Sequence, residues 1–152
     1  GVQTCALPIS GYPRRRALVA FGSDVMFGAP TWAFADAYSD CAPTFVYRFD
    51  HVTSTLRALG LGATHGSEIV HVQHSYGSYL GRKLHPLGRH VAPAVGRRMQ
   101  RSWLEFAGGG TPGPDWPQYR VPRRAVQIIG TTRDVTVDDP DAARRTAWQG
   151  MR

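Results

Sequence analysis

The strongest constraint on the fold is one segment near the middle of the chain, which carries apolar side chains along a single helical face. Between residues 91 and 107 they recur in steps of four, four, four and three, at Val91, Val95, Met99, Trp103 and Phe106. This spacing predicts an α-helix with one buried stripe, with Arg98 and Arg101 on the opposite face. We expect the helix to end at Gly108, in the C′ position that favours glycine. The stripe needs an apolar surface to cover it.

Two segments predict the strands that would supply that surface. Thr44–Phe49, "TFVYRF", is rich in β-branched and aromatic residues with partial alternation, and Ala125–Ile129 reads "AVQII". Two strands cannot close a sheet, and they leave the apolar faces of the helices with little to bury against. The sequence therefore predicts an α/β fold whose sheet is incomplete within these residues.

Two further helices are predicted, one before these elements in the sequence and one after them. The first covers residues 23–39, with Ser23 or Asp24 as N-cap and Pro30 as a break or kink. The second has Asp139 as N-cap and Pro140 at its first position, and ends at Gly150. Residues 76–90 and 108–119 lack a clear period and are predicted to be loops, the former exposed.

Length and composition restrict the class of protein. The 152 residues suit one domain, and 42% apolar residues are enough for a packed core. No apolar run approaches the length of a membrane span. The net charge of +7 raises nucleic acid as a partner, but the 17 Arg and single Lys are scattered, with no stripe that interleaves aromatics. We therefore predict no nucleic-acid partner; the Arg-rich, Lys-poor composition fits GC-rich codon use.

The first nine residues, "GVQTCALPI", show no periodicity and no cap or turn signal. They match the translation of GGA GTT CAG ACG TGT GCT CTT CCG ATC, a string that resembles a sequencing-library adapter. We therefore expect residues 1–9 not to be native and residues 10–152 to be the tail of a longer protein. Without Cys5, Cys41 stands alone and no disulfide is predicted. Localisation and oligomeric state receive no prediction.

His65 is the candidate for chemistry, in the stretch "LGATHGSEIVHV". A lone histidine is more often structural than catalytic, but this one lies on a small-residue loop after a predicted strand, with a glycine behind it. In serine hydrolases with the α/β-hydrolase fold, the catalytic triad runs along the chain as Ser, acid, His. A late histidine on a loop after a strand fits the third place.

Six separated blocks follow one another along the chain: Ser23–Pro30, Ala42–Asp50, Leu61–Ile69, Met99–Ala107, Trp116–Tyr119 and Val137–Trp148. In order and spacing they resemble the C-terminal part of type-B carboxylesterases, the family that also includes the cholinesterases. They correspond in turn to the segment after the family's acid residue, its late strand, the block around its catalytic histidine, its late helix, the following loop and the terminus of bacterial members.

The resemblance implies that residues 10–152 form the C-terminal part of a single α/β-hydrolase catalytic domain. His65 would be the general base and acid of a serine esterase that works through an acyl-enzyme, with a small-molecule ester as substrate and no cofactor. Glu68 is too near His65 in sequence to reach behind the imidazole, and the family places its acid upstream, so we predict a buried carboxylate that supports the site indirectly, the alternative being a solvated loop glutamate. The chain holds no G-x-S-x-G, so the nucleophile, triad acid and oxyanion hole are expected upstream and this chain alone is expected to be inactive. The alternative function is a non-catalytic binding or adhesion domain of the same family.

Other polar residues receive structural predictions. His71 and Gln73 stand where the family usually has aromatic residues, which leaves the pocket shape open. His65, His71 and His74 could suggest a metal site, but without HExxH or a cysteine pair we predict surface histidines and no metal. Trp103 and Phe106 are predicted in the core. The aspartates are predicted at a helix end, a turn and a strand end, and these are Asp36, Asp40 and Asp50.

Overall fold

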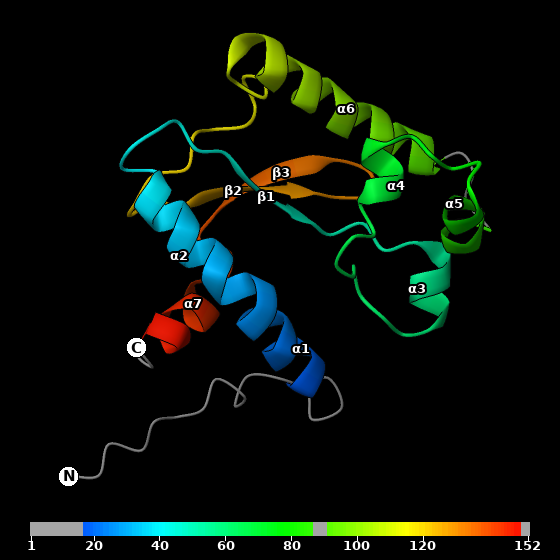
Figure 1. Cartoon of the computed structure of the whole chain (residues 1–152), viewed down its shortest axis with the longest axis horizontal. Coiled ribbons are helices and arrows are strands. Elements are labelled where there is room, and N and C mark those ends of the chain that lie inside the picture. The colour runs from blue at the N-terminus through cyan, green and yellow to red at the C-terminus, as the bar shows by residue number, and fades with distance from the viewer. Residues whose placement is uncertain (1–16, 87–90, 150–152) are drawn as a thin grey trace. The chain divides into compact units, whose positions relative to one another are not determined.

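The computed structural model describes residues 17–86 and 91–149 of the chain (Figure 1). The nonapeptide 1–9 and the predicted helix stop at Gly150 lie outside the described residues. The contacts divide the chain into two units. The first comprises the described residues up to Thr44 together with 119–124 and 138–149, and the second comprises Phe45–Gln118 and Ala125–Val137. No helix in the described ranges is both long and apolar enough to cross a membrane.

A three-stranded sheet forms the centre of the second unit. Its strands are β1 (Val46–Phe49), β2 (Ala125–Ile129) and β3 (Asp134–Asp138), in the order β1-β2-β3. β1 and β2 are parallel, with Val46 opposite Val126 and Phe49 opposite Ile129. Every residue of β2 is buried, as expected of a central strand. Both predicted strands are confirmed, within two residues at the start of β1.

β3 was not predicted. In a half-buried strand the apolar side chains usually face the core, whereas in β3 the valines face solvent. Val135 and Val137 are each 38% exposed, while the polar residues between them are turned inward. The Thr136 hydroxyl donates to Oε1 of Gln127 on β2 at 2.8 Å. Asp134 pairs with Arg98, whose Nε lies 3.0 Å from the carboxylate. Polar pairing rather than apolar burial thus attaches β3 to its neighbour.

The amphipathic helix is α6 (Val91–Gly109), which lies along the sheet (Figure 1). Its prediction is confirmed, although it ends at Gly109 and the left-handed residue after it is Gly110, with φ of +75°. The stripe is buried only in its middle. Val95 and Met99 form the core with Trp116 and Ile129, and Trp103 packs against it.

The two ends of the stripe depart from the prediction. Val91 is 43% exposed and Phe106 is 48% exposed, so Phe106 is not a core residue, although its ring lies edge-on to that of Phe45 at a centroid distance of 5.9 Å. The opposite face also differs, because Arg98 is not simply solvated. Its guanidinium donates to the Gly130 carbonyl at 2.6 Å as well as pairing with Asp134.

Three short helices connect β1 to α6. They are α3 (Ser54–Ala58), α4 (Ile69–Val72) and α5 (Tyr79–Leu84). Hydroxyl caps start two of them: Thr53 accepts from Leu56 N at 3.2 Å, and Ser78 accepts from Gly81 N at 3.0 Å. The prediction of an exposed loop over residues 76–90 is therefore wrong for α5. Gly81, which lowers helix propensity, is required there because a Cβ would lie 2.7 Å from the Tyr76 Cα.

The first unit contains a helical run of α1 (Ala17–Ser23), a π-helical turn η2 (Asp24–Gly28) and α2 (Ala29–Tyr38). The predicted N-cap is wrong, because Ser23 has helical φ and ψ of −62° and −39° and makes no capping bond. Asp24 is instead a buried partner of Arg144. Pro30 lies in the first turn of α2, just after the π turn, where a missing N–H is tolerated and the helical run continues.

α7 (Ala142–Gln149) packs beside α2 in the same unit (Figure 1). It begins at Ala142, so the prediction of Asp139 as N-cap and Pro140 at the first position is wrong. Asp139 adopts a left-handed φ of +44°, and its carboxylate accepts hydrogen bonds from the guanidinium of Arg145 instead of capping the helix. The Asp139 carboxylate is therefore bound by the Arg145 side chain, and not by the backbone N–H groups at the start of the helix.

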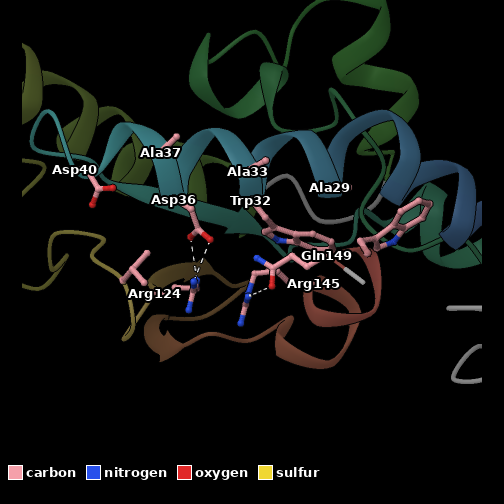
Figure 2. A pocket seen from close by; sticks show the side chains of 11 residues that line it. Ala29, Trp32, Ala33, Asp36, Ala37, Asp40, Arg124, Arg145 and Gln149 are labelled. Carbon is pink, nitrogen blue, oxygen red and sulfur yellow. Dashed lines mark hydrogen bonds and ion pairs between the residues drawn. The ribbon is translucent and has the colours of Figure 1, made fainter. Parts of the chain in front are cut away.

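Asp36 is the centre of a polar cluster on α2 rather than a helix-end residue as predicted. Its carboxylate accepts from Arg124 Nε at 2.9 Å (Figure 2), and it also accepts from the Tyr119 hydroxyl at 2.7 Å. Burial raises the pKa of Asp36, but the hydrogen bonds from Arg124 and Tyr119 and the charges of Arg124 and Arg145 outweigh it, so the pKa is lowered. Asp40, in the turn after α2, and Asp50, just after β1, lie where predicted.

Candidate active site

His65 is held on a tight turn between α3 and α4. The Thr64 carbonyl accepts from both the backbone N–H and the hydroxyl of Ser67, at 3.0 and 2.7 Å. Gly66 has φ of +79°, a conformation that a side chain would strain. These bonds close the backbone around His65 and leave its own side chain exposed. The sequence "T-H-G-S" thus presents an imidazole at the surface of the second unit on a defined turn.

Ser67, next to this turn, is not arranged as a nucleophile. It is 4% exposed, and its hydroxyl hydrogen is donated to the Thr64 carbonyl. A serine nucleophile needs an accessible oxygen and a base that takes its hydrogen. The chain also contains no G-x-S-x-G segment. Ser67 therefore serves the turn, and the chemistry available here is that of the histidine.

Glu68 lies at the start of α4, three residues after His65. It is half-buried and close enough to Tyr47 on β1 for its charge to matter. The pKa of Tyr47 is raised by burial first and by the Glu68 charge second. Glu68 is therefore near β1 and three residues along the chain from the imidazole. Its role toward His65 stays a prediction.

The remaining histidines differ from the prediction of surface residues. His74 is exposed, but His71 is completely buried, at 0% exposure. The histidine rings that pack against its own are those of His51 and His85, with ring centroids 5.0 and 4.9 Å away, and this is the histidine group that the described residues bring together. Burial, followed by the charges of the neighbouring histidines, lowers the pKa of His71 to about 4. The sequence carried no local signal for this group, because its members are 20 and 14 residues apart.

Comparisons with known proteins identify the family of the chain. The model of the carboxylesterase family matches residues 10–148. The cocaine esterase of Oryctolagus cuniculus is 31% identical over 113 residues, which is 70% of this chain and 20% of that protein. The chain therefore spans about a fifth of the length of this curated relative.

Solved structures agree on the fold. A carboxylesterase from Geobacillus stearothermophilus superimposes with a TM-score of 0.75 at 26% identity, over 92% of this chain and 29% of its own. A PNB esterase gives a TM-score of 0.77 at 24% identity, over 87% of this chain and 27% of its own. These proteins have the α/β-hydrolase fold, of which the three strands and their helices form one portion. Because the family model matches almost the whole sequence, this chain belongs to the carboxylesterase family.

Proposed function

We propose that residues 10–152 form the C-terminal part of the catalytic domain of a carboxylic-ester hydrolase, with His65 as its triad histidine. Membership of the carboxylesterase family supports the reaction class. The share of 20% to 29% of the relatives' length supports a larger intact protein. The observation that carries the role of His65 is its exposed imidazole on a turn that Gly66 and the Thr64–Ser67 bonds define.

In the proposed mechanism the imidazole moves one proton back and forth. One ring nitrogen takes the proton from a serine hydroxyl as the oxygen attacks the ester carbonyl, and the same nitrogen then protonates the leaving alcohol. The acyl-enzyme is hydrolysed by water along the same route. The serine, the triad acid and the oxyanion hole come from the preceding part of the protein. Glu68 supports the turn indirectly, from a half-buried position at the start of α4.

The test is a substitution of His65 in the protein encoded by the extended reading frame. With p-nitrophenyl butyrate, His65→Ala should lower kcat by roughly 10³-fold or more, because the attacking serine loses its base. His74→Asn is the matched control, since His74 is exposed and its φ of +50° suits Asn. It should leave kcat within about twofold, as expected for a surface substitution away from the chemistry.

Retention of more than a tenth of the activity in His65→Ala would contradict the assignment. An extended frame that lacks a serine in a G-x-S-x-G elbow would favour the alternative, a non-catalytic binding domain of the same family. The two outcomes are distinguishable because the first leaves an active enzyme and the second leaves none to measure.

A further inference from the structure

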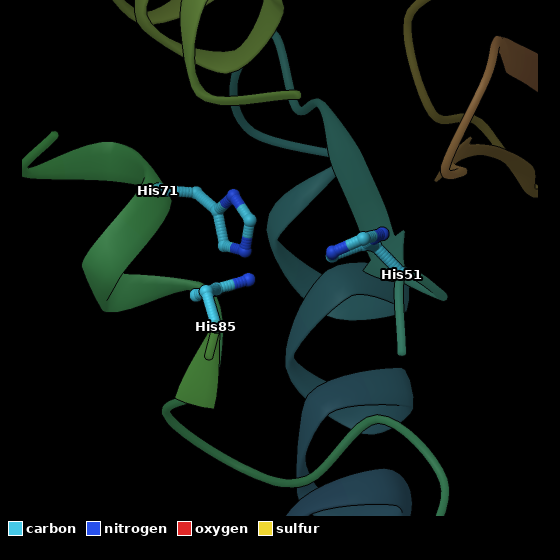
Figure 3. A group of neighbouring side chains, drawn as sticks. All are labelled: His51, His71 and His85. Carbon is cyan, nitrogen blue, oxygen red and sulfur yellow. The ribbon is translucent and has the colours of Figure 1, made fainter. Parts of the chain in front are cut away.

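Three histidine side chains from separate elements meet in the interior of the second unit. His51 follows the end of β1, His71 lies on α4, and His85 follows α5. They are 5%, 0% and 6% exposed. Figure 3 shows the three rings directed toward one another, and one ring nitrogen from each lies within 4.8 Å of the other two. The fold thus brings together three side chains whose first and last members, His51 and His85, are 34 positions apart in the sequence.

Each of the three rings has one nitrogen without a hydrogen-bond partner in the part of the chain that the structure describes. Nε2 of each of the three rings is buried and lacks a hydrogen bond from any side chain or backbone group of the described residues. A buried polar atom without a partner costs roughly 1–3 kcal/mol. Three such atoms in one place are unusual, since most buried polar groups are satisfied. They indicate a ligand that accepts lone pairs.

The protonation of His71 can be worked out from its neighbours. The Tyr76 hydroxyl donates its hydrogen to the Ala92 carbonyl at 2.6 Å. Toward Nδ1 of His71, therefore, both the Tyr76 oxygen at 3.1 Å and the Ala92 oxygen at 3.3 Å can only accept. Nδ1 must carry the ring hydrogen, which leaves Nε2 with its lone pair directed into the cluster. A ring N–H held by a carbonyl is the usual support of a metal-binding histidine.

His51 has a corresponding support. Its Nδ1 lies 3.0 Å from the Thr131 hydroxyl, which can accept the ring hydrogen and leave Nε2 free to coordinate. His85 lines a cavity of about 450 Å³ that also borders Tyr76, Arg82 and Ala92. Because the cavity reaches one of the three rings, it would give an ion a path to the cluster and a water molecule access to a fourth coordination position.

We propose that His51, His71 and His85 bind a divalent transition-metal ion, most suitably Zn²⁺, through their Nε2 atoms. Three neutral imidazoles with no carboxylate among them suit zinc, copper or nickel rather than magnesium or calcium. Nitrogens bound to zinc at about 2.1 Å in tetrahedral geometry lie about 3.4 Å apart. Small rotations of the rings from their spacing within 4.8 Å would achieve this.

The ion would act as a structural clamp close to the proposed catalytic turn. Residues 52–70, which include α3 and His65, form the chain between His51 and His71. Fixing both ends of this segment and the end of α5 would restrict the backbone that carries the turn. The metal site does not depend on the proposed ester hydrolysis, so either proposal can fail without the other.

Metal titration of the 152-residue chain, purified with a tag that contains no histidine, tests the site. After treatment with a chelator, Zn²⁺ should bind with one-to-one stoichiometry and raise Tm, because an ion that binds only the folded state stabilises it. Co²⁺ should give the visible absorption of a four-coordinate site with nitrogen ligands. If the metal-free chain is unfolded, helical circular dichroism should appear as Zn²⁺ is added.

Substitutions identify the ligands. His51→Asn and His85→Asn should each weaken Zn²⁺ binding by about 100-fold or more, exceeding the usual loss for a supporting residue. His71→Phe keeps an aromatic ring in the buried position, so it should remain folded without metal and bind none. His74→Asn, outside the cluster, should bind as the wild-type chain does.

Three results would overturn the proposal. These are a wild-type chain that binds Zn²⁺ no more tightly than His71→Phe, a Tm or circular dichroism spectrum unchanged by Zn²⁺, and cluster variants that retain wild-type affinity. Each of them would leave the three rings as a packed aromatic cluster with unpaired nitrogens.

Discussion

At the scale of single residues, polar side chains in this chain find partners far away in sequence. Asp36 on α2 pairs with Arg124, 88 positions along the chain, and their side chains are 20% and 14% exposed. The hydroxyl of Tyr119 completes the group. Burial raises the pKa of Tyr119, and so does its hydrogen bond to Asp36. The sequence offered only an aspartate near the end of a predicted helix, because nothing in the neighbouring residues identifies such partners.

Asp36→Asn should destabilise the folded chain by about 2 kcal/mol at pH 7, between the cost of a surface pair and that of a fully buried one. Urea unfolding measures it. Because the folded pKa of Asp36 is lowered from 3.8, its contribution is present above pH 3.8 and is lost as the pH falls through the folded value. The difference between variant and wild type should therefore shrink in acid.

The matched control for this substitution is Asp138→Asn. Asp138 pairs with Arg123, but their side chains are 55% and 58% exposed, so solvent screens the pair. Its loss should cost no more than about 0.5 kcal/mol at any pH. Equal effects of the two substitutions would show that the Asp36 group is no stronger than a surface ion pair.

At the scale of elements, the helix α6 packs against two different parts of the second unit, the sheet and the region around His71. Its periodic apolar residues predicted the helix correctly, and the middle of the stripe packs on the sheet. Gly96, on the same helix, allows close approach of the histidine region. A Cβ there would lie 2.9 Å from the His71 carbonyl oxygen and would also meet the Tyr76 hydroxyl. Helix propensity alone would have favoured alanine at this position.

Gly96→Ala should therefore destabilise the chain by about 1–2 kcal/mol despite the better helix propensity, because the clash with backbone cannot be relieved by a side-chain rotation. Gly108→Ala in the last turn of α6 has nothing within 4 Å of the new Cβ. It should stabilise by up to about 1 kcal/mol. Thermal unfolding of both variants gives the comparison, and the same sign for both would show that α4 does not pack closely against α6.

At the scale of the whole molecule, the chain spans only a part of the length of its relatives. The chain matches two solved carboxylesterase and esterase structures over 87% to 92% of its own length but over 27% to 29% of theirs. The candidate base, His65, is on the surface of the second unit, and the hydroxyl of Ser67 donates its hydrogen to the Thr64 carbonyl within the turn. The proposed ester hydrolysis therefore requires groups from outside these 152 residues.

The 152-residue chain alone should have no esterase activity. Without an activated serine, p-nitrophenyl acetate should be hydrolysed no faster than by an equal concentration of free imidazole. His65→Ala should give the same rate as the wild-type chain. Saturable turnover that disappears in His65→Ala would contradict this expectation and would require a nucleophile within the chain.

The sequence by itself determined the elements whose signal is local. The period of four in α6 and the β-branched runs of β1 and β2 are set by neighbours along the chain, so both could be identified before the structure. The resemblance around His65 likewise depended on a contiguous block. The tertiary structure decided the remainder, because β3, the buried position of His71 and the partners of Asp36 depend on residues that are distant in sequence. Polar groups satisfied across such separations leave no period to detect, and that is why the histidine cluster became visible only in the folded chain.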